Sequence, residues 1–111
     1  MMRILILEDE PIIAIDLEDT VRDRCDADVC LADSVAEAEA HLKRGAFDFA
    51  LLDVRLKGRG ETSLAIAQRL ARDKVPFCFV SSAIDPLPPH FQNVPHVTKP
   101  FELSQLEAVL P

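Results

Sequence analysis

The sequence predicts an α/β fold, a doubly wound sheet of five parallel strands with a short or irregular fourth helix. Short apolar runs alternate with segments of helical period along the chain, which is typical of parallel strands joined by right-handed crossovers. Four of the eight prolines fall between residues 83 and 95, where the fourth helix would lie, and a proline inside a helix costs about 3 kcal/mol. We expect one domain, residues 1–111, which is long enough to bury a core.

The first predicted strand, Met2 to Leu7, is an apolar run without alternation, as in a strand that is buried on both faces. Three acids, Glu8 to Glu10, end the run. Pro11 then suits the first turn of a helix, where its missing N–H costs nothing. This helix is predicted to reach Arg24. Its expected apolar face consists of Ile12, Ile13, Leu17 and Val21.

Two further strands are predicted on either side of the second helix, a weak one over Ala27 to Ala32 and a third strand over Phe49 to Val54. Ser34 followed by Glu37 has the spacing of a capping box, which begins a helix. Gly45 is expected to end that helix as a C-cap.

The second half of the chain is less regular. We expect a flexible loop over Arg55 to Glu61, a helix over Leu64 to Ala71 and a fourth strand over Phe77 to Ser81. Residues 83–95 should be irregular, with at most a single turn, and should form the most mobile internal segment because few apolar contacts hold them. Val97 and Thr98 form a short fifth strand. The apolar positions of the third helix are Leu64, Ala67, Leu70 and Ala71, and those of the closing helix are Leu103, Leu106 and Leu110.

Composition and charge exclude several classes of protein. The net charge of −7 argues against nucleic-acid binding, and no apolar stretch approaches the roughly 20 residues of a membrane span. Acids follow the first apolar run at once, which no signal peptide shows. The three cysteines, Cys25, Cys30 and Cys78, have no metal-type or redox-type spacing, and their odd number suits reduced thiols. We therefore expect a cytoplasmic protein without nucleic-acid or membrane partners.

Four polar residues each stand at the end of a predicted strand: Asp9, Asp53, Ser81 and Lys99. Parallel strands bring their carboxyl ends to one rim, where open sheets bind ligands. In the flavodoxin-like strand order 2-1-3-4-5, the first and third strands are neighbours, so Asp9 and Asp53 would lie side by side. At about 5 Å and an effective dielectric constant near 20, two carboxylates repel by roughly 3 kcal/mol. Such a pair needs a cation, and Mg²⁺ suits oxygen ligands of this kind.

Each residue of this set also has an ordinary interpretation. The acids Glu8 to Glu10 could be a solvated turn at the start of a helix, Lys99 a surface lysine and Ser81 an incidental hydroxyl. Asp53 is harder to explain in this way because it follows an apolar run covered on both faces. Together, the residues fit an aspartate that is a nucleophile toward a phosphoryl group. Asp53 would attack, Mg²⁺ and Lys99 would hold the phosphoryl oxygens, and Ser81 would bond the new phosphate.

These residues give the whole chain a resemblance to the receiver domain of two-component response regulators. The positions that carry it are Glu8-Asp9, Asp53, Ser81 and Lys99-Pro100-Phe101. The resemblance implies a phosphoryl-accepting module of a His-Asp phosphorelay, phosphorylated by a sensor histidine kinase, with a downstream protein partner; it also allows a homodimer. It implies no turnover enzyme, although receivers can catalyse their own phosphoryl transfer and dephosphorylation.

The resemblance also implies a role for each site residue. Asp53 would be the phosphoacceptor, Ser81 the switch hydroxyl and Lys99 the cation that pairs with the phosphate. Mg²⁺ would be bound by Glu8, Asp9, Asp53 and the backbone carbonyl of Arg55. The Lys99-Pro100 peptide is similar to one that is usually cis in receivers.

A narrower resemblance is to the single-domain receivers of the FAT GUY subgroup, which have a poorly formed fourth helix. It rests on residues 76–82, the proline-rich stretch and residues 98–101. It implies an HWE-type kinase or a close relative and general stress signalling. Val80-Ser81-Ser82 departs from the usual Ala-Thr-Gly of the subgroup. Glu8 also replaces the commoner aspartate of receivers.

His96 stands where most receivers have tyrosine or phenylalanine. It could titrate near neutral pH, or it could simply be a polar residue on an edge strand. Two other functions also stay open: a receiver-like interaction domain that works without phosphorylation, and a metal-dependent hydrolase. The intact acids, Ser81 and Lys99 argue against the first, and the lack of a general acid, a substrate loop or a P-loop motif argues against the second.

Overall fold

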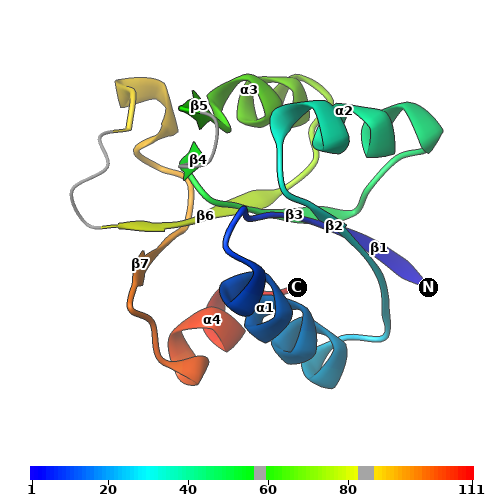
Figure 1. Cartoon of the computed structure of the whole chain (residues 1–111), viewed down its shortest axis with the longest axis vertical. Helices are drawn as coiled ribbons and strands as arrows, with labels where there is room; N and C mark the ends of the chain where they lie inside the picture. Colours follow the sequence, from blue (N-terminus) through cyan, green and yellow to red (C-terminus); the bar gives the residue numbers. More distant parts are fainter. Residues whose placement is uncertain (57–59, 83–86) are drawn as a thin grey trace.

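The computed structural model describes residues 1–56, 60–82 and 87–111, and its centre is a parallel sheet between two layers of helices (Figure 1). The five strands follow the order β2-β1-β3-β6-β7, so the first and third strands are neighbours, as predicted. Their bounds are β1 Met2–Leu7, β2 Ala27–Ala32, β3 Phe49–Leu52, β6 Phe77–Ser82 and β7 His96–Lys99. The predicted α/β fold class is confirmed.

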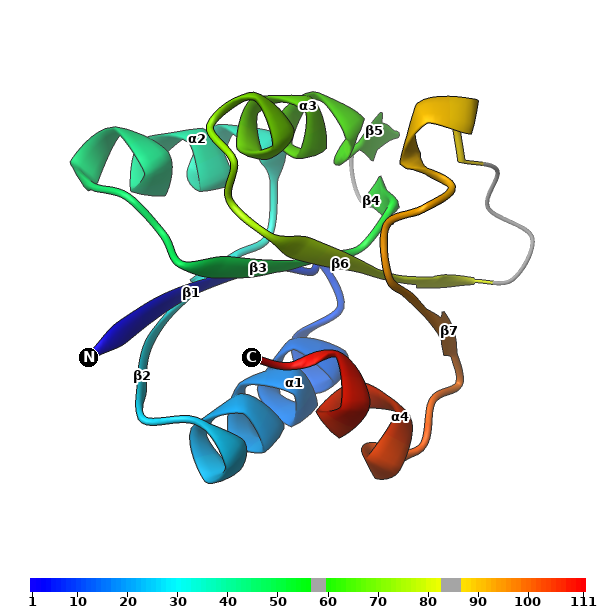
Figure 2. The ribbon, with the colours of Figure 1, turned by 180° about the vertical axis from the view of Figure 1, so that it is seen from behind.

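Two helices cover each face of the sheet (Figures 1 and 2). Their bounds are α1 Pro11–Arg24 and α4 Leu103–Val109 on one face, and α2 Val35–Arg44 and α3 Leu64–Arg72 on the other. Each face has its own apolar cluster. Ile4 and Ile6 of β1 belong to the cluster beside α1 and α4, whereas Leu5 and Leu7 belong to the cluster beside α2 and α3. Within the described parts of the chain, no helix has the length and apolar content to cross a membrane.

Three predicted helix faces were partly wrong. Ile12 is 79% exposed and Leu103 is 57% exposed, because each lies in the first turn of its helix and faces away from the sheet. In α3, Ile66 is buried and Ala71 is exposed. Only part of each apolar periodic pattern therefore contacts the core, and the remainder stays on the surface.

A short antiparallel hairpin stands where the sequence suggested only a flexible loop. It pairs β4 (Arg55–Leu56) with β5 (Glu61–Thr62), and residues 57–59 of the expected loop lie outside the described residues. Leu56 is buried in the cluster beside α2 and α3, which gives the hairpin an apolar anchor. The third strand also ends at Leu52, two residues earlier than predicted, so Asp53 follows the strand directly.

The second helix begins with the predicted cap. Ser34 Oγ accepts the backbone N–H of Glu37 at 3.2 Å. The Glu37 carboxylate accepts the backbone N–H of Asp33 at 3.0 Å, one residue before the position that a capping box would use. Gly45 follows the helix in an extended conformation, with φ of 163°, and not in the left-handed conformation typical of a glycine C-cap.

The connection from β6 to β7 is irregular, as predicted, in its described part, residues 87–95. It contains one turn of 3-10 helix, η1 (Pro89–Phe91); residues 83–86 of the predicted segment lie outside the described residues. Phe91 is buried with its ring edge-on to Phe77 and Phe79, at centroid distances of 6.0 and 5.7 Å. This apolar anchor contradicts the premise that few apolar contacts hold the segment, while its mobility stays a prediction.

Candidate functional site

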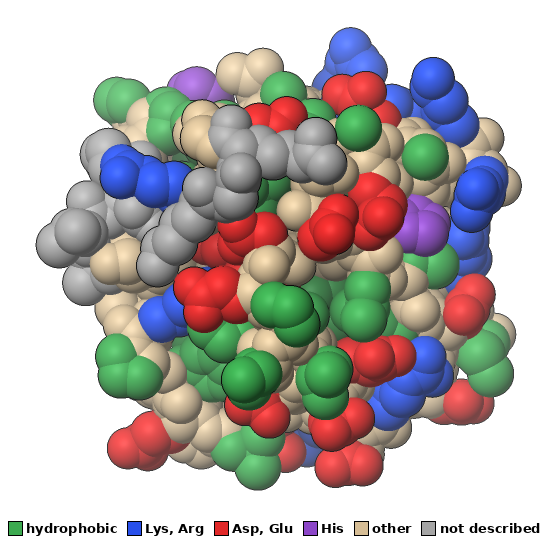
Figure 3. Space-filling model, in the orientation of Figure 1, with side chains coloured by type: hydrophobic (Ala, Val, Ile, Leu, Met, Phe, Trp, Pro, Cys, Tyr) green, Lys and Arg blue, Asp and Glu red, His purple; other side chains and the backbone are tan. Residues whose placement is uncertain are grey.

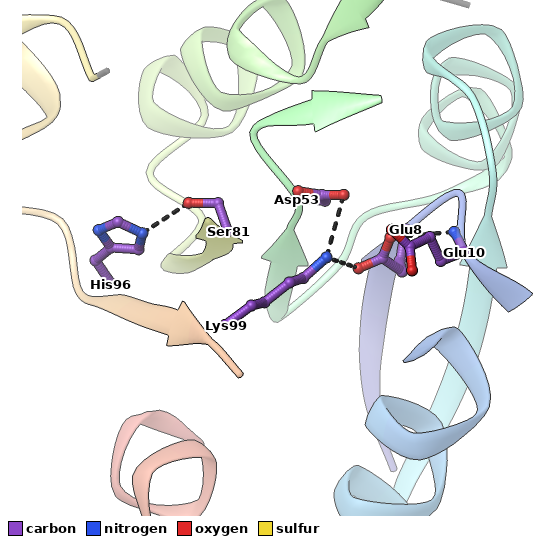
Figure 4. A network of polar contacts seen from close by, with 6 residues as sticks. All are labelled: Glu8, Glu10, Asp53, Ser81, His96 and Lys99. Carbon is purple, nitrogen blue, oxygen red and sulfur yellow. Dashed lines mark hydrogen bonds and ion pairs between the residues drawn. The ribbon is translucent and has the colours of Figure 1, made fainter. Parts of the chain in front are cut away.

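The side chains predicted to form the site meet at the carboxyl ends of four parallel strands (Figure 4). Glu8 and Asp9 follow β1, and Asp53 follows β3. Ser81 lies near the end of β6, and Lys99 is the last residue of β7. The register explains the convergence, because Leu7 of β1 pairs with Leu52 of β3 and the residues that follow leave the sheet together.

Three carboxylates form an acidic cluster at this rim. One oxygen from each of Glu8, Asp9 and Asp53 lies within 4.8 Å of the others. Glu8 is buried, Asp9 is half-buried and Asp53 is 6% exposed. The structure thus brings together carboxylates that lie more than 40 residues apart in the chain. Clustered carboxylate oxygens are the hard ligands that Mg²⁺ prefers, so these residues fit the ion.

Lys99 lies against two of the three acids. Its Nζ is 2.5 Å from Glu8 Oε1 and 3.4 Å from Asp53 Oδ2 (Figure 4). Burial alone would lower the pKa of Lys99, but the hydrogen bond and the charge of Glu8, together with Asp53, raise this pKa above its ordinary value. Lys99 is therefore a cation at neutral pH, aimed between the two carboxylates.

Asp53 has a strongly perturbed acidity. The pKa of its carboxyl is raised from 3.8 to about 7, mainly by burial and then by the charge of Glu8, while Lys99 opposes the increase. A buried carboxylate is costly without compensating charge, and one lysine does not balance three acids. A proton on this cluster reduces the excess negative charge, and a divalent metal cation would balance it.

Glu8 has a second contact that fixes it in place. Its Oε2 accepts the backbone N–H of Glu10 at 3.1 Å, just before α1 begins at Pro11. Glu8 therefore connects Lys99 to the start of a helix. Arg55, whose backbone carbonyl was expected to be a metal ligand, lies at the start of the β4–β5 hairpin, two residues after Asp53. Its role as a ligand stays a prediction.

Ser81 has an unexpected partner. It is fully buried, and its Oγ lies 2.7 Å from Nε2 of His96. Figure 4 shows this hydroxyl pointing toward His96 and away from Asp53. From its sequence position, His96 was expected to be only a titrating group or a polar residue on an edge strand. The strand register explains this contact: His96 pairs with Phe79, so it shares a sheet face with Ser81, two residues further along β6.

The surface next to the acidic cluster is apolar. Figure 3 shows acidic side chains near the middle of this face and hydrophobic side chains below them, over α1. Ile12 and Ile15 of α1 are exposed. A cavity of about 340 Å³ lies beside them, and its lining includes Glu8, Asp9, Ile15 and Leu31. The acidic rim therefore adjoins a surface suited to contact with another macromolecule.

A scan of the sequence against protein-family models gives no match, and a search of curated proteins gives none either. Solved structures do match. The solution structure of SdrG from Sphingomonas melonis Fr1 is 37% identical with a TM-score of 0.84, and the match covers 98% of this chain and 92% of SdrG.

Two PhyR structures are also similar. The PhyR stress response regulator is 32% identical with a TM-score of 0.79 over 96% of this chain and 42% of that protein. The receiver domain of the PhyR response regulator from Erythrobacter litoralis is 28% identical with a TM-score of 0.82, over 97% of this chain and 85% of that one. This chain thus spans nearly the whole of SdrG and less than half of the longer PhyR structure.

Proposed function

The chain belongs to the receiver-domain family of response regulators, and we propose that it is a signalling module phosphorylated on Asp53 by a sensor histidine kinase with Mg²⁺. The observation that carries the proposal is the cluster of three carboxylates with Lys99 among them at the carboxyl rim of the sheet. This arrangement supplies a nucleophile, a cation for the transferred group and ligands for a metal.

The chemistry assigns a role to each group. A carboxylate oxygen of Asp53 attacks the phosphorus of a phosphohistidine; the new O–P bond forms as the P–N bond breaks, and the imidazole leaves with the electron pair and takes a proton from solvent. Lys99 neutralises charge on the phosphoryl oxygens. Glu8 and Asp9, with Asp53, would hold Mg²⁺, which would supply further positive charge to those oxygens. Because Asp53 is only 6% exposed, transfer requires side chains around it to move aside.

The partners of this module follow from the same proposal. We propose a role in stress signalling, on the basis of the similarity to the PhyR stress response regulator. We also propose a kinase of the HWE type or a close relative, which the resemblance to the FAT GUY receivers implies. Membership of the FAT GUY subgroup stays a prediction, because Val80-Ser81-Ser82 departs from its motif. The three free cysteines suit the reducing cytoplasm.

Phosphorylation is tested with a small acyl phosphate as donor. The protein is incubated with acetyl phosphate and Mg²⁺ and its intact mass is measured at once. We expect the mass of one phosphoryl group to be added to the wild type and to Asp19→Asn, a matched control at an exposed aspartate of α1, but not to Asp53→Asn. An equal gain in mass for the wild type and Asp53→Asn, or no gain in either, would contradict the proposal. Release of more than one phosphate per protein from a stable phosphate ester would instead indicate a hydrolase.

A further inference from the structure

We propose that His96 is a positioning residue, which holds the Ser81 hydroxyl away from Asp53 until Asp53 is phosphorylated. The inference rests on the proposed function and adds a residue to it. Its basis is the hydrogen bond of 2.7 Å between Ser81 Oγ and His96 Nε2, which links the ends of β6 and β7 beside the acidic cluster. Figure 4 shows the hydroxyl directed along this bond, on the side opposite to Asp53 and Lys99.

The burial of Ser81 makes this bond important. Its side chain is fully buried, so its hydroxyl cannot exchange His96 for bulk water. When a buried hydroxyl loses its hydrogen-bond partner, the cost of removing it from water is no longer compensated, and the conformation is destabilised. While Asp53 carries no phosphate, the bond to His96 therefore keeps Ser81 in the rotamer that the structure shows.

A serine hydroxyl has one hydrogen to donate. If that hydrogen is donated to the Nε2 lone pair of His96, it is not available to a phosphoryl oxygen on Asp53. A phosphoryl group brings three strong, charged acceptors, and hydrogen bonds to charged acceptors are roughly twice as strong as neutral ones. The phosphoryl oxygens can therefore replace His96 as the acceptor of the Ser81 hydroxyl hydrogen. The existing bond to His96 opposes this exchange. The neutral imidazole must then carry its own hydrogen on Nδ1.

The first test needs no phosphate. Long-range ¹H–¹⁵N spectra of the full chain at pH 8 should show His96 as a neutral imidazole with Nε2 unprotonated, and Ser81→Ala should shift the Nε2 signal. His90 is the internal control, because its ring lies against Phe91, and its signals should not change. A hydrogen on Nε2 of His96, or an Nε2 signal that Ser81→Ala leaves in place, would overturn the inference.

The second test uses beryllofluoride with Mg²⁺ as a mimic of the phosphoryl group, and follows its binding by backbone amide shifts. His96→Leu removes the acceptor at an exposed position, and we expect it to bind beryllofluoride about two- to ten-fold more tightly than the wild type, as expected for the loss of one opposing hydrogen bond. His96→Gln retains an acceptor and should stay close to the wild type. His90→Gln is the control for a histidine elsewhere. Amide spectra without ligand establish that each variant is folded.

The outcomes separate the two proposals. If the wild type binds no beryllofluoride, the proposed function fails and the role of His96 fails with it. If the wild type binds but His96→Leu binds equally or more weakly, only the inference about His96 is wrong. Tighter binding by His96→Leu, with His96→Gln and His90→Gln near the wild type, supports the inference, because a merely structural role of His96 would weaken binding.

Discussion

Replacing Asp53 with asparagine should stabilise the metal-free protein, and the gain should increase with pH. Burial and, to a lesser extent, the charge of Glu8 raise the pKa of Asp53 to about 7 from 3.8, its value in the unfolded chain. Between these two values the folded protein holds a proton that the unfolded chain has lost, so the stability of the wild type falls as pH rises through this window. Asparagine has no proton to lose and is free of this effect.

The size of the gain follows from the two pKa values. At 1.36 kcal/mol for each unit of pKa, ionisation of Asp53 destabilises the fold by about 2 kcal/mol at pH 5 and by about 4 kcal/mol at pH 8. The advantage of Asp53→Asn should therefore grow by about 2 to 3 kcal/mol between these pH values. Effects of asparagine on packing and on the contact with Lys99 that do not depend on pH cancel in this difference.

The assay is urea unfolding of the wild type and Asp53→Asn at pH 5 and pH 8, with EDTA to remove metals. With an m-value of about 2 kcal/mol/M, the gap between the two midpoints should widen by about 1 M or more from pH 5 to pH 8. Asp19→Asn, at an exposed position of α1, is the control for the loss of one carboxylate. An advantage that is constant with pH, or that shrinks toward pH 8, would refute the argument that Asp53 carries a buried, costly charge.

Three further substitutions or additions give separate expectations. Mg²⁺ at about one hundred times its dissociation constant should stabilise the wild type by about 2.7 kcal/mol in thermal unfolding. Asp9→Asn should lose most of this gain, and an unchanged melting temperature for the wild type would argue against a metal site. Phe91→Ala should destabilise the fold by about 3 to 5 kcal/mol and speed hydrogen exchange in residues 87–95. Exchange rates equal to those of the wild type would contradict an anchoring role of Phe91. Arg3→Ala should cost about 1 kcal/mol in urea unfolding, because the guanidinium lies 4.5 Å from the centroid of the Phe47 ring, and Arg3→Lys should restore part of the loss.

Much of the site could be predicted from the sequence because its geometry follows from topology. Asp9, Asp53, Ser81 and Lys99 each lie near or just past the carboxyl end of a strand, and parallel strands deliver such residues to one rim whatever their side chains contact. The sheet order also made Asp9 and Asp53 neighbours before any distance was known. These predictions needed only the type and order of the elements.

The side-chain contacts could not be predicted in the same way. The bond between Ser81 and His96 depends on the register of β6 and β7 and on one rotamer, neither of which the sequence specifies. Lys99 was expected to serve the phosphate, yet in the structure its shortest contact is with Glu8, because that carboxylate is also held by the backbone at the start of α1. The exposure of Ile12 depends on the exact rotation of α1 against the sheet.

The side-chain pattern of β1 has a consequence for how this strand is aligned in the sheet. Ile4 and Ile6 face one apolar cluster and Leu5 and Leu7 face the other, so sliding the strand by one residue would exchange side chains of nearly equal volume. Packing alone hardly opposes such a slip. The polar ends of the strand do oppose it: the backbone N–H of Arg3 donates to the Asp48 carboxylate at 2.8 Å, and Glu8 contacts Lys99 at the other end. An acid of the candidate site thus also fixes the alignment of the strand that precedes it.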